Sequence, residues 1–229
     1  KSRFGKSMYI IYFKPYTEKV WGINPDQLDP RTASSRISFD SAFDFLYKIL
    51  KHSITKRADF STIHNPLKDS FYYAKGGIGK ICDGLYNECI RLGVKFNFGY
   101  EIEKMIKKDL KIKKVQISNG KSISNFDYII STIPLTILTK SLDYNHEYPL
   151  RFRAMILGFF SFDKEKLSDY HWIYTPGKNL CFTRVTEFSQ LKGAEMAPKG
   201  KANICLEMPC FIEDQVWSLN DSKIIEAMR

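Results

Sequence analysis

Residues 71–98 read FYYAKGGIGKICDGLYNECIRLGVKFNF, and this stretch decides what kind of fold the chain can adopt. The adjacent glycines Gly76 and Gly77 permit a tight turn, and a helical apolar pattern begins directly behind them. Gly93 suits the position after a helix C-terminus, and residues 94–98 alternate as a strand does. The stretch therefore predicts a turn, a helix and a strand. The apolar positions of the predicted helix are Ile78, Ile81, Cys82, Leu85, Cys89 and Ile90.

A β-meander is predicted after this first strand. Residues 101–106 and 111–118 carry patterns typical of strands, and Asn119-Gly120 is a pair favoured in type I′ hairpin turns. Residues 126–134 read FDYIISTIP and predict a buried strand that is ended by proline. The middle of the chain is therefore expected to fold as helix, strand, meander and strand.

The flanking regions contain both helical and strand patterns, so the predicted fold class is α/β in the mixed α+β sense. Residues 1–20 have the apolar spacing of a helix, and Ser38 or Asp40 can cap a second helix. A short helix is expected behind Pro134, and Asp221 is expected to cap a last one. Further strands are predicted at residues 152–162, 171–174, 180–185 and 202–208.

The composition is that of an ordinary folded protein with one large domain or two small ones. The 229 residues are 44% hydrophobic and 26% charged, which excludes a disordered chain and a coiled coil. No run approaches the ~18 apolar residues of a membrane-spanning helix, and no signal peptide is recognisable. The cysteines form no C-x-x-C pair, which favours a reducing, cytoplasmic location. Because the chain begins at Lys1 without methionine and stops at Arg229 within a helical pattern, we expect a fragment.

The positive charge is concentrated in the first half of the chain. The net charge is +10, with 22 Lys+Arg against 12 Asp+Glu in residues 1–120 and 13 against 13 in residues 121–229. The densest part is residues 104–114, where six lysines interleave with apolar residues. This interleaving is typical of the solvated face of a β-hairpin, and the alternative is a surface that attracts anions. No zinc-finger, helix-turn-helix or RNP pattern supports a nucleic-acid partner.

Common catalytic motifs do not identify an active site. Gly77-Ile78-Gly79 begins a G-x-G-x-x-G dinucleotide pattern, but Cys82 stands where the third glycine is required. The four histidines are scattered without zinc-binding spacing, and no G-x-S-x-G occurs. We therefore predict no metal site and nominate no catalytic residue or general base.

Longer strings carry a family resemblance over nearly the whole chain. In order, they are YTEKVWG at residues 16–22, FYYAKGGIG at 71–79, DYIISTIP at 127–134, DYHWIY at 169–174, RVTEF at 184–188 and EMAP at 195–198. Together they resemble the FAD-dependent amine oxidase and protoporphyrinogen oxidase superfamily. The resemblance is strongest to its bacterial branch related to UDP-galactopyranose mutase, which is often found with polysaccharide synthesis.

The resemblance implies a discontinuous FAD-binding domain of the amine oxidase type beside a substrate domain of mixed sheet with flanking helices. Residues 71–134 would be the central segment of the FAD domain, and residues 1–70 and 135–229 would be the two parts of the substrate domain, the second of them truncated. This chain lacks the G-x-G-x-x-G site, the ribose-binding acid and the C-terminal flavin contacts, so we expect it to bind FAD weakly or not at all. By resemblance, the cofactor-binding residues are Gly76, Gly77, Ile102, Thr132, Ile133 and Pro134.

The implied function is that of a fragment of an FAD-dependent oxidoreductase in cell-surface polysaccharide or small-molecule metabolism. The full-length parent would be an enzyme, and the fragment alone would be inactive. The alternatives are a flavin-dependent nucleotide-sugar mutase and a non-catalytic anion-binding module on the same fold. Without its missing segments, the FAD domain would expose a face through which the chain self-associates. Because arginines suit diphosphates and aromatic rings stack on uracil or sugar, the candidate substrate-binding residues are Arg36, Tyr170, His171, Trp172 and Arg184.

Overall fold

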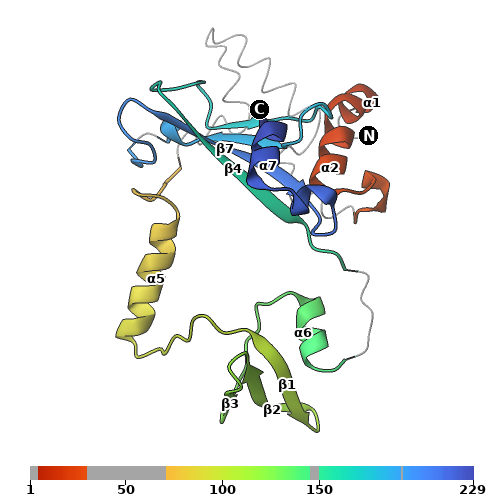
Figure 1. Ribbon diagram of the computed structural model, residues 1–229, viewed down its shortest axis with the longest axis vertical. Coiled ribbons are helices and arrows are strands. Elements are labelled where there is room, and N and C mark those ends of the chain that lie inside the picture. Colours follow the sequence, from red (N-terminus) through yellow and green to blue (C-terminus); the bar gives the residue numbers. More distant parts are fainter. Residues whose placement is uncertain (1–4, 30–70, 145–149, 192) are drawn as a thin grey trace. The chain divides into compact units, whose positions relative to one another are not determined.

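The computed structural model contains helices and two antiparallel sheets in its described residues, which confirms the predicted mixed α/β fold (Figure 1). The described residues are 5–29, 71–144, 150–191 and 193–229. The predicted helix capped by Ser38 or Asp40 lies outside them. Within them, every helix is too short or too polar to cross a membrane. The chain divides into two compact units, Lys1–Gly84 together with Arg153–Arg229, and Leu85–Phe152.

The first unit is built on a four-stranded sheet in the order β4-β7-β6-β5, with antiparallel neighbours throughout. β4 and β7 pair along their whole length, from Ala154 opposite Cys210 to Phe162 opposite Ala202. The strands predicted at residues 152–162, 171–174 and 202–208 are confirmed as β4, β5 and β7. The strand predicted at residues 180–185 begins only at Arg184. The bounds are β4 Ala154–Phe162, β5 Trp172–Tyr174, β6 Arg184–Glu187 and β7 Ala202–Cys210.

One face of this sheet packs against α7 (Asp221–Met228), as Figure 1 shows. Leu206, Met208 and Met228 are buried there, because the period of two along β7 directs its even-numbered side chains toward the helix. Gly158 on β4 leaves room for the Met228 sulfur, which a Cβ at that position would overlap. The helix is capped by Asn220, whose Oδ1 accepts from the Lys223 N–H at 3.0 Å. The prediction that Asp221 is the cap was therefore wrong by one residue.

The N-terminal helical region is continuous but changes its winding. It consists of α1 (Gly5–Met8), the π-helical η1 (Tyr9–Phe13) and α2 (Lys14–Trp21), and a short 3-10 turn, η2 (Pro25–Gln27), follows. Arg153 fastens the C-terminus of α2 to the sheet, because its Nε donates to the Val20 carbonyl at 3.0 Å and its Nη2 to the Lys19 carbonyl at 3.2 Å. The same guanidinium lies 4.2 Å from the centre of the Phe211 ring. One side chain thus satisfies two carbonyls of the helix end and makes a cation–π contact.

The second unit contains the predicted meander. Its strands are β1 (Ile102–Lys108), β2 (Lys111–Ile117) and β3 (Ser122–Ser124), and α6 (Leu135–Ser141) packs against β1. Met105, Val115 and Ile117 form the core, with Phe126, Leu138 and Leu142 packed around it. A turn at Asn119-Gly120 is confirmed between β2 and β3, where Gly120 has a φ of +74°. The predicted type I′ conformation was wrong, because it requires a positive φ at both central residues and Asn119 does not have one.

Two predicted strands are absent from the described residues. Residues 94–98 and 126–133 are not strands, and Ile130 is 91% exposed where a buried strand was predicted. An apolar run becomes a strand only when a neighbouring backbone accepts its hydrogen bonds, and the structure describes no strand paired with either run. The helix α5 (Gly79–Arg91) forms as predicted, but most of its apolar residues are exposed, with Leu85 at 64%.

Candidate functional site

The sheet of the first unit has a second face, opposite α7, on which aromatic, charged and apolar side chains gather. The strand register places Tyr174 beside Arg184, Arg184 beside Glu207, and Glu207 beside Leu157 in one row. Because side chains two positions apart on a strand share a face, a second row runs parallel to this one. We call this surface the open face, and its residues are Leu157, Phe159, Trp172, Tyr174, Arg184, Thr186, Asn203, Cys205 and Glu207.

An ion pair occupies the middle of the open face. Arg184 donates from Nε and Nη2 to the same Glu207 carboxylate oxygen, at 2.7 and 2.6 Å. Burial alone would lower the pKa of Arg184, but hydrogen bonds with Glu207 and Tyr174 raise it above its usual value. A guanidinium carries five donors, and the Arg184 side chain is 36% exposed, so it can still bind an anionic group. Glu207 balances the charge, which lets the arginine lie half-buried.

Aromatic rings flank this ion pair. At one end Tyr16 of α2 meets Tyr174 edge-to-face with ring centres 5.8 Å apart, and Tyr12 stacks on Tyr16 at 5.8 Å. On the other side the Trp172 ring lies 5.5 Å from both Phe71 and His171. Such rings supply flat apolar surfaces with polar edges, which suit stacking on a nucleobase or a sugar.

A buried carboxylate shapes the segment that leads into β5. Glu187 is 3% exposed and accepts from the Leu167 N–H at 2.7 Å and from the Ser168 N–H and hydroxyl, each at 2.8 Å. The Ser189 hydroxyl adds a fourth bond at 2.9 Å. Burial alone would raise the pKa of Glu187, but these hydrogen bonds lower it below its usual value. Glu187 thereby holds the turn just before Tyr170.

The glycine turn predicted to approach a cofactor is clamped by the protein itself. The Gly76 N–H donates to the Ala194 carbonyl at 2.7 Å, and Lys75 pairs with Glu195 at 2.8 Å. Gly77 is buried with a φ of +101°, and a Cβ there would lie 3.3 Å from the Met196 sulfur. Backbone conformation and packing therefore explain why this position requires glycine.

An unsatisfied acceptor lies beside this turn. Among the described residues, the Oδ1 of Asn203 is the buried side-chain polar atom without a hydrogen-bond partner. Its amide nitrogen reaches the Met196 carbonyl at 3.5 Å, so Asn203 joins the open face to the segment that clamps Gly77. A buried acceptor without a donor is a place where a ligand hydroxyl or N–H can bind.

The remaining predicted cofactor residues lie in the second unit. Ile102 opens β1 opposite Ile117 and is 39% exposed, and Pro134 is the N-cap of α6. Thr132 and Ile133 precede that cap in an irregular segment. The predicted set is therefore divided between the two units, and its convergence on one ligand stays a prediction.

The predicted substrate residues cluster in part. Trp172 and Arg184 share the open face, His171 contacts Trp172, and Tyr170 lies next to them at 45% exposure. Arg36 lies outside the described residues. Sequence reasoning missed Tyr174, Glu187, Asn203 and Glu207. A signal for two of them was present, because Asn203 and Glu207 stand at alternate positions of an otherwise apolar strand.

The open face contains one thiol, and it is not reactive. Cys205 is 4% exposed, and burial together with the nearby Glu207 charge raises its pKa to about 11. At neutral pH the thiol is therefore protonated and cannot act as a nucleophile. In the part of the chain that the structure describes, no three His, Cys, Asp or Glu side chains converge as a metal site would require.

Comparison with known proteins defines the fold. No protein-family model matches the chain, and no curated protein matches it. Among solved structures, reduced UDP-galactopyranose mutase matches 99% of this chain with a TM-score of 0.69 and 22% identity. The chain spans 48% of that structure's length. The PF1083 protein from Pyrococcus furiosus matches 67% of this chain and 38% of its own, at 21% identity and a TM-score of 0.48.

The likeness to the mutase shows that the chain has a fold of the UDP-galactopyranose mutase type. This confirms the fold that the resemblance to that branch implied, and the fold alone. The wider relation to amine oxidases and protoporphyrinogen oxidases stays a prediction.

We predict that Gly77→Ala destabilises the protein by about 2 kcal/mol, because the left-handed conformation strains any residue with a Cβ and the added methyl presses on Met196. The matched control is Gly84→Ala, in the interior of α5 with open space around it, which should be neutral or stabilising. Thermal unfolding of the two variants checks this. Equal melting temperatures would contradict the role assigned to Gly77.

We predict that Glu187→Gln lowers the free energy of unfolding by about 2 kcal/mol at neutral pH, since it weakens several charge-assisted hydrogen bonds. Because the folded pKa is lowered, this stabilisation is present above the unfolded value of about 4.3 and is lost as the pH falls through the folded value. Urea unfolding at a series of pH values should show the two proteins converging in acid. The exposed Glu165→Gln in the same segment is the control, and a Glu187→Gln deficit that stays constant with pH would refute the assignment.

Proposed function

We propose that this chain is the substrate-binding and central part of a flavin-dependent nucleotide-sugar mutase resembling UDP-galactopyranose mutase. The observation that carries the proposal is the fold likeness over 99% of the chain, combined with an open face on which rings surround an accessible arginine. The sequence strings alone favoured an FAD-dependent oxidoreductase of the amine oxidase type. The fold comparison supports the mutase alternative better.

The open face suits a nucleotide sugar in three respects. Trp172 and Tyr174, 40% and 36% exposed, offer ring surfaces for the base or the sugar. Arg184 can bind a diphosphate oxygen while Glu207 holds its guanidinium in place. The Asn203 Oδ1 can accept from a sugar hydroxyl or an N–H group. Base, phosphate and sugar are thereby each matched by a separate group.

A flavin, when bound, would supply the electron chemistry, and the protein would orient the substrate and exclude water. The residues proposed to approach it are Gly76, Gly77, Ile102 and residues 132–134. The Gly76 N–H already donates to the Ala194 carbonyl. The turn would therefore contact a flavin through its surface, without a hydrogen bond from this N–H. The sequence contains no G-x-G-x-x-G, and we propose that these residues bind FAD weakly or not at all by themselves. The five free cysteines fit a reducing cytoplasm as the proposed location.

We predict that UDP-galactose binds this chain and that Arg184→Gln/Glu207→Gln weakens binding at least tenfold, as expected for a lost charge-assisted contact worth about 1.5–3 kcal/mol. The double change removes both charges together, so that neither is left buried and unpaired. Isothermal titration calorimetry measures the affinity. Arg91→Gln, which removes an arginine paired with Glu88 on exposed α5, is the matched control. Unchanged affinity in the double variant would remove the open face from the proposal.

The mutase and oxidase readings differ in their redox balance. A mutase that uses reduced flavin needs a reductant for activity but consumes no acceptor per turnover, whereas an oxidase consumes one acceptor for each substrate. Assays of the full-length parent with dithionite-reduced flavin and UDP-galactose, followed by sugar analysis and oxygen uptake, separate them. Oxygen consumption proportional to product would favour the oxidase.

We also propose that the chain self-associates through the exposed apolar runs of the second unit. Phe98, Tyr128 and Ile130 are 71%, 90% and 91% exposed, and such runs pair readily with other strands. Sedimentation velocity should show concentration-dependent dimers or larger species, which Ile130→Asp reduces. The control is Ile212→Asp, 61% exposed in the first unit. A monomer at all concentrations would contradict the proposal.

A further inference from the structure

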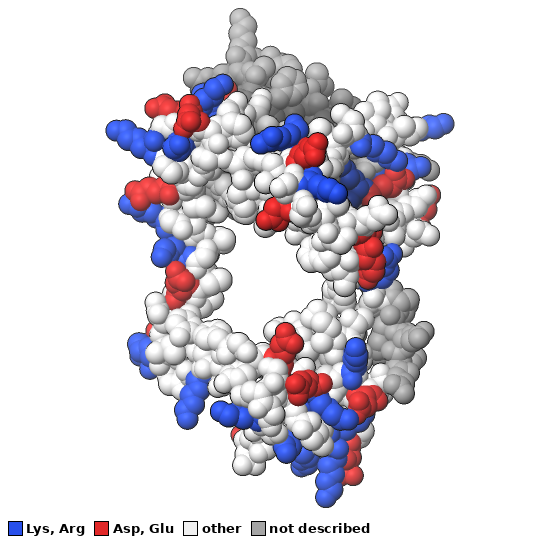
Figure 2. Space-filling model, in the orientation of Figure 1, with Lys and Arg blue, Asp and Glu red and all other residues white. Residues whose placement is uncertain are grey.

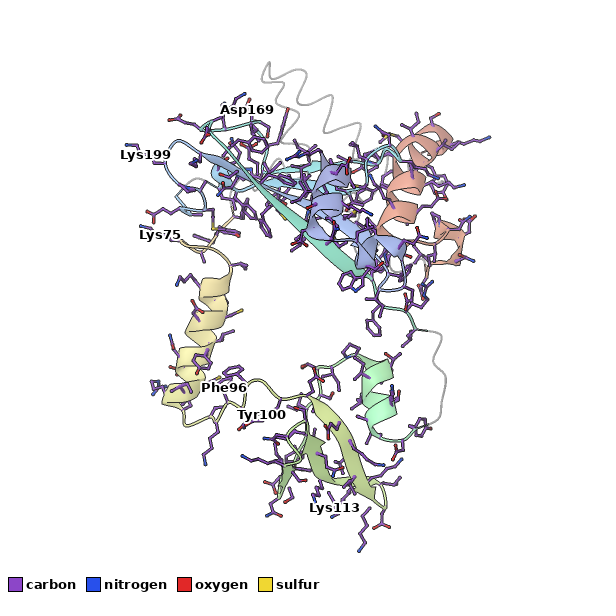
Figure 3. All side chains as sticks on the ribbon, viewed as in Figure 1. Lys75, Phe96, Tyr100, Lys113, Asp169 and Lys199 are labelled. Carbon is purple, nitrogen blue, oxygen red and sulfur yellow. The ribbon has the colours of Figure 1, made fainter. Side chains whose placement is uncertain are left out.

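The β1–β2 hairpin combines dense positive charge with an exposed apolar residue in its turn, and the proposed mutase function uses neither. Residues 104–114 contain six lysines and a single acid, Asp109. Figure 2 shows basic side chains gathered at this end of the second unit, and Figure 3 labels Lys113 among them. We call residues 107–114 the hairpin tip.

Two of the six lysines are bound within the unit. Lys104 pairs with Asp143 at 2.7 Å, and Lys107 lies 5.7 Å from the centre of the Tyr144 ring. The other four form no ion pair with any residue that the structure describes, and all four are exposed. They are Lys108, Lys111, Lys113 and Lys114.

The strand register sets two of these charges against each other. Lys108 lies directly opposite Lys111 in the antiparallel ladder. Like charges at facing positions destabilise a β-sheet pair. The hairpin tip therefore carries an electrostatic cost that an anionic surface would relieve.

The tip also exposes an apolar side chain. Leu110 follows Asp109, whose φ of +57° makes the tight turn, and Leu110 is 103% exposed. An apolar residue at the end of a hairpin, surrounded by lysines with long flexible stems, matches the interface of a lipid bilayer, where the apolar group inserts and the ammonium groups meet the headgroups.

We propose that the hairpin tip docks on a membrane surface rich in anionic lipids. Charge complementarity selects the anionic headgroups, and insertion of Leu110 selects a bilayer over other polyanions. A nucleic acid fits less well, because residues 102–117 contain no aromatic side chain for base stacking. The docking is peripheral and uses the hairpin alone.

Vesicle co-sedimentation tests the proposal with phosphatidylcholine vesicles that contain about one third phosphatidylglycerol, and with pure phosphatidylcholine as reference. The protein should bind the anionic vesicles selectively, and salt should weaken the binding. Leu110→Ser should lower the partition constant about tenfold, and Lys108→Gln/Lys111→Gln about thirtyfold. The matched controls are Leu92→Ser, 67% exposed at the end of α5, and Lys164→Gln/Lys199→Gln in the first unit.

Binding that the hairpin variants weaken and the controls do not would support the proposal. Absence of vesicle binding would overturn it. So would binding that is insensitive to Leu110, or binding to an oligonucleotide of equal charge that is as tight as binding to vesicles. None of these outcomes depends on nucleotide-sugar binding, so the proposal fails or succeeds separately from the proposed function.

Discussion

The alternation of side chains along β7 is the constraint on which the first unit depends. Its even-numbered residues, Leu206 and Met208, are buried against α7, so its odd-numbered residues must face the other way. This geometry alone places Asn203, Cys205 and Glu207 on the open face. A shift of one residue in the pairing with β4 would bury Glu207 beneath the helix and expose Leu206, so the core and the candidate site are specified by the same register.

Glu207 and Glu187 have different structural roles on this sheet. Glu207 lies beside Arg184 and holds a charged side chain at the surface of the open face, where a ligand can reach it. Glu187 lies three positions after Arg184 on β6 and therefore on the opposite face of the sheet. It is buried and accepts from backbone N–H groups of the segment before β5. One glutamate therefore orients a binding group and the other fixes the loop that carries Tyr170 and His171.

The elements that could be predicted from the sequence are those whose stabilising contacts are local or follow a simple period. The β1–β2 strands and α5 formed as predicted, and a turn formed at Asn119-Gly120, because their patterns need only near neighbours. The strand expected at residues 126–134 did not form. Its apolar pattern is typical of a buried strand, but a strand needs a hydrogen-bonded neighbour, and the structure describes none beside it. The site could be predicted only in part for a related reason. Tyr174 and Glu207 belong to the site because they lie opposite Arg184 on neighbouring strands. The register that pairs them cannot be read from a single sequence.

The Gly76-Gly77 turn shows that a glycine motif alone does not identify a ligand site. In sequence, adjacent glycines suggest a backbone that a cofactor approaches closely. In the structure, Gly76 and Gly77 have φ values of +81° and +101°, and Gly77 also borders Met196. Backbone conformation and packing within the protein therefore explain both glycines. The stronger indication of a ligand lies nearby in Asn203, whose buried Oδ1 is left without a donor. An unsatisfied polar atom costs free energy unless something binds it, whereas a satisfied glycine turn is stable without any ligand.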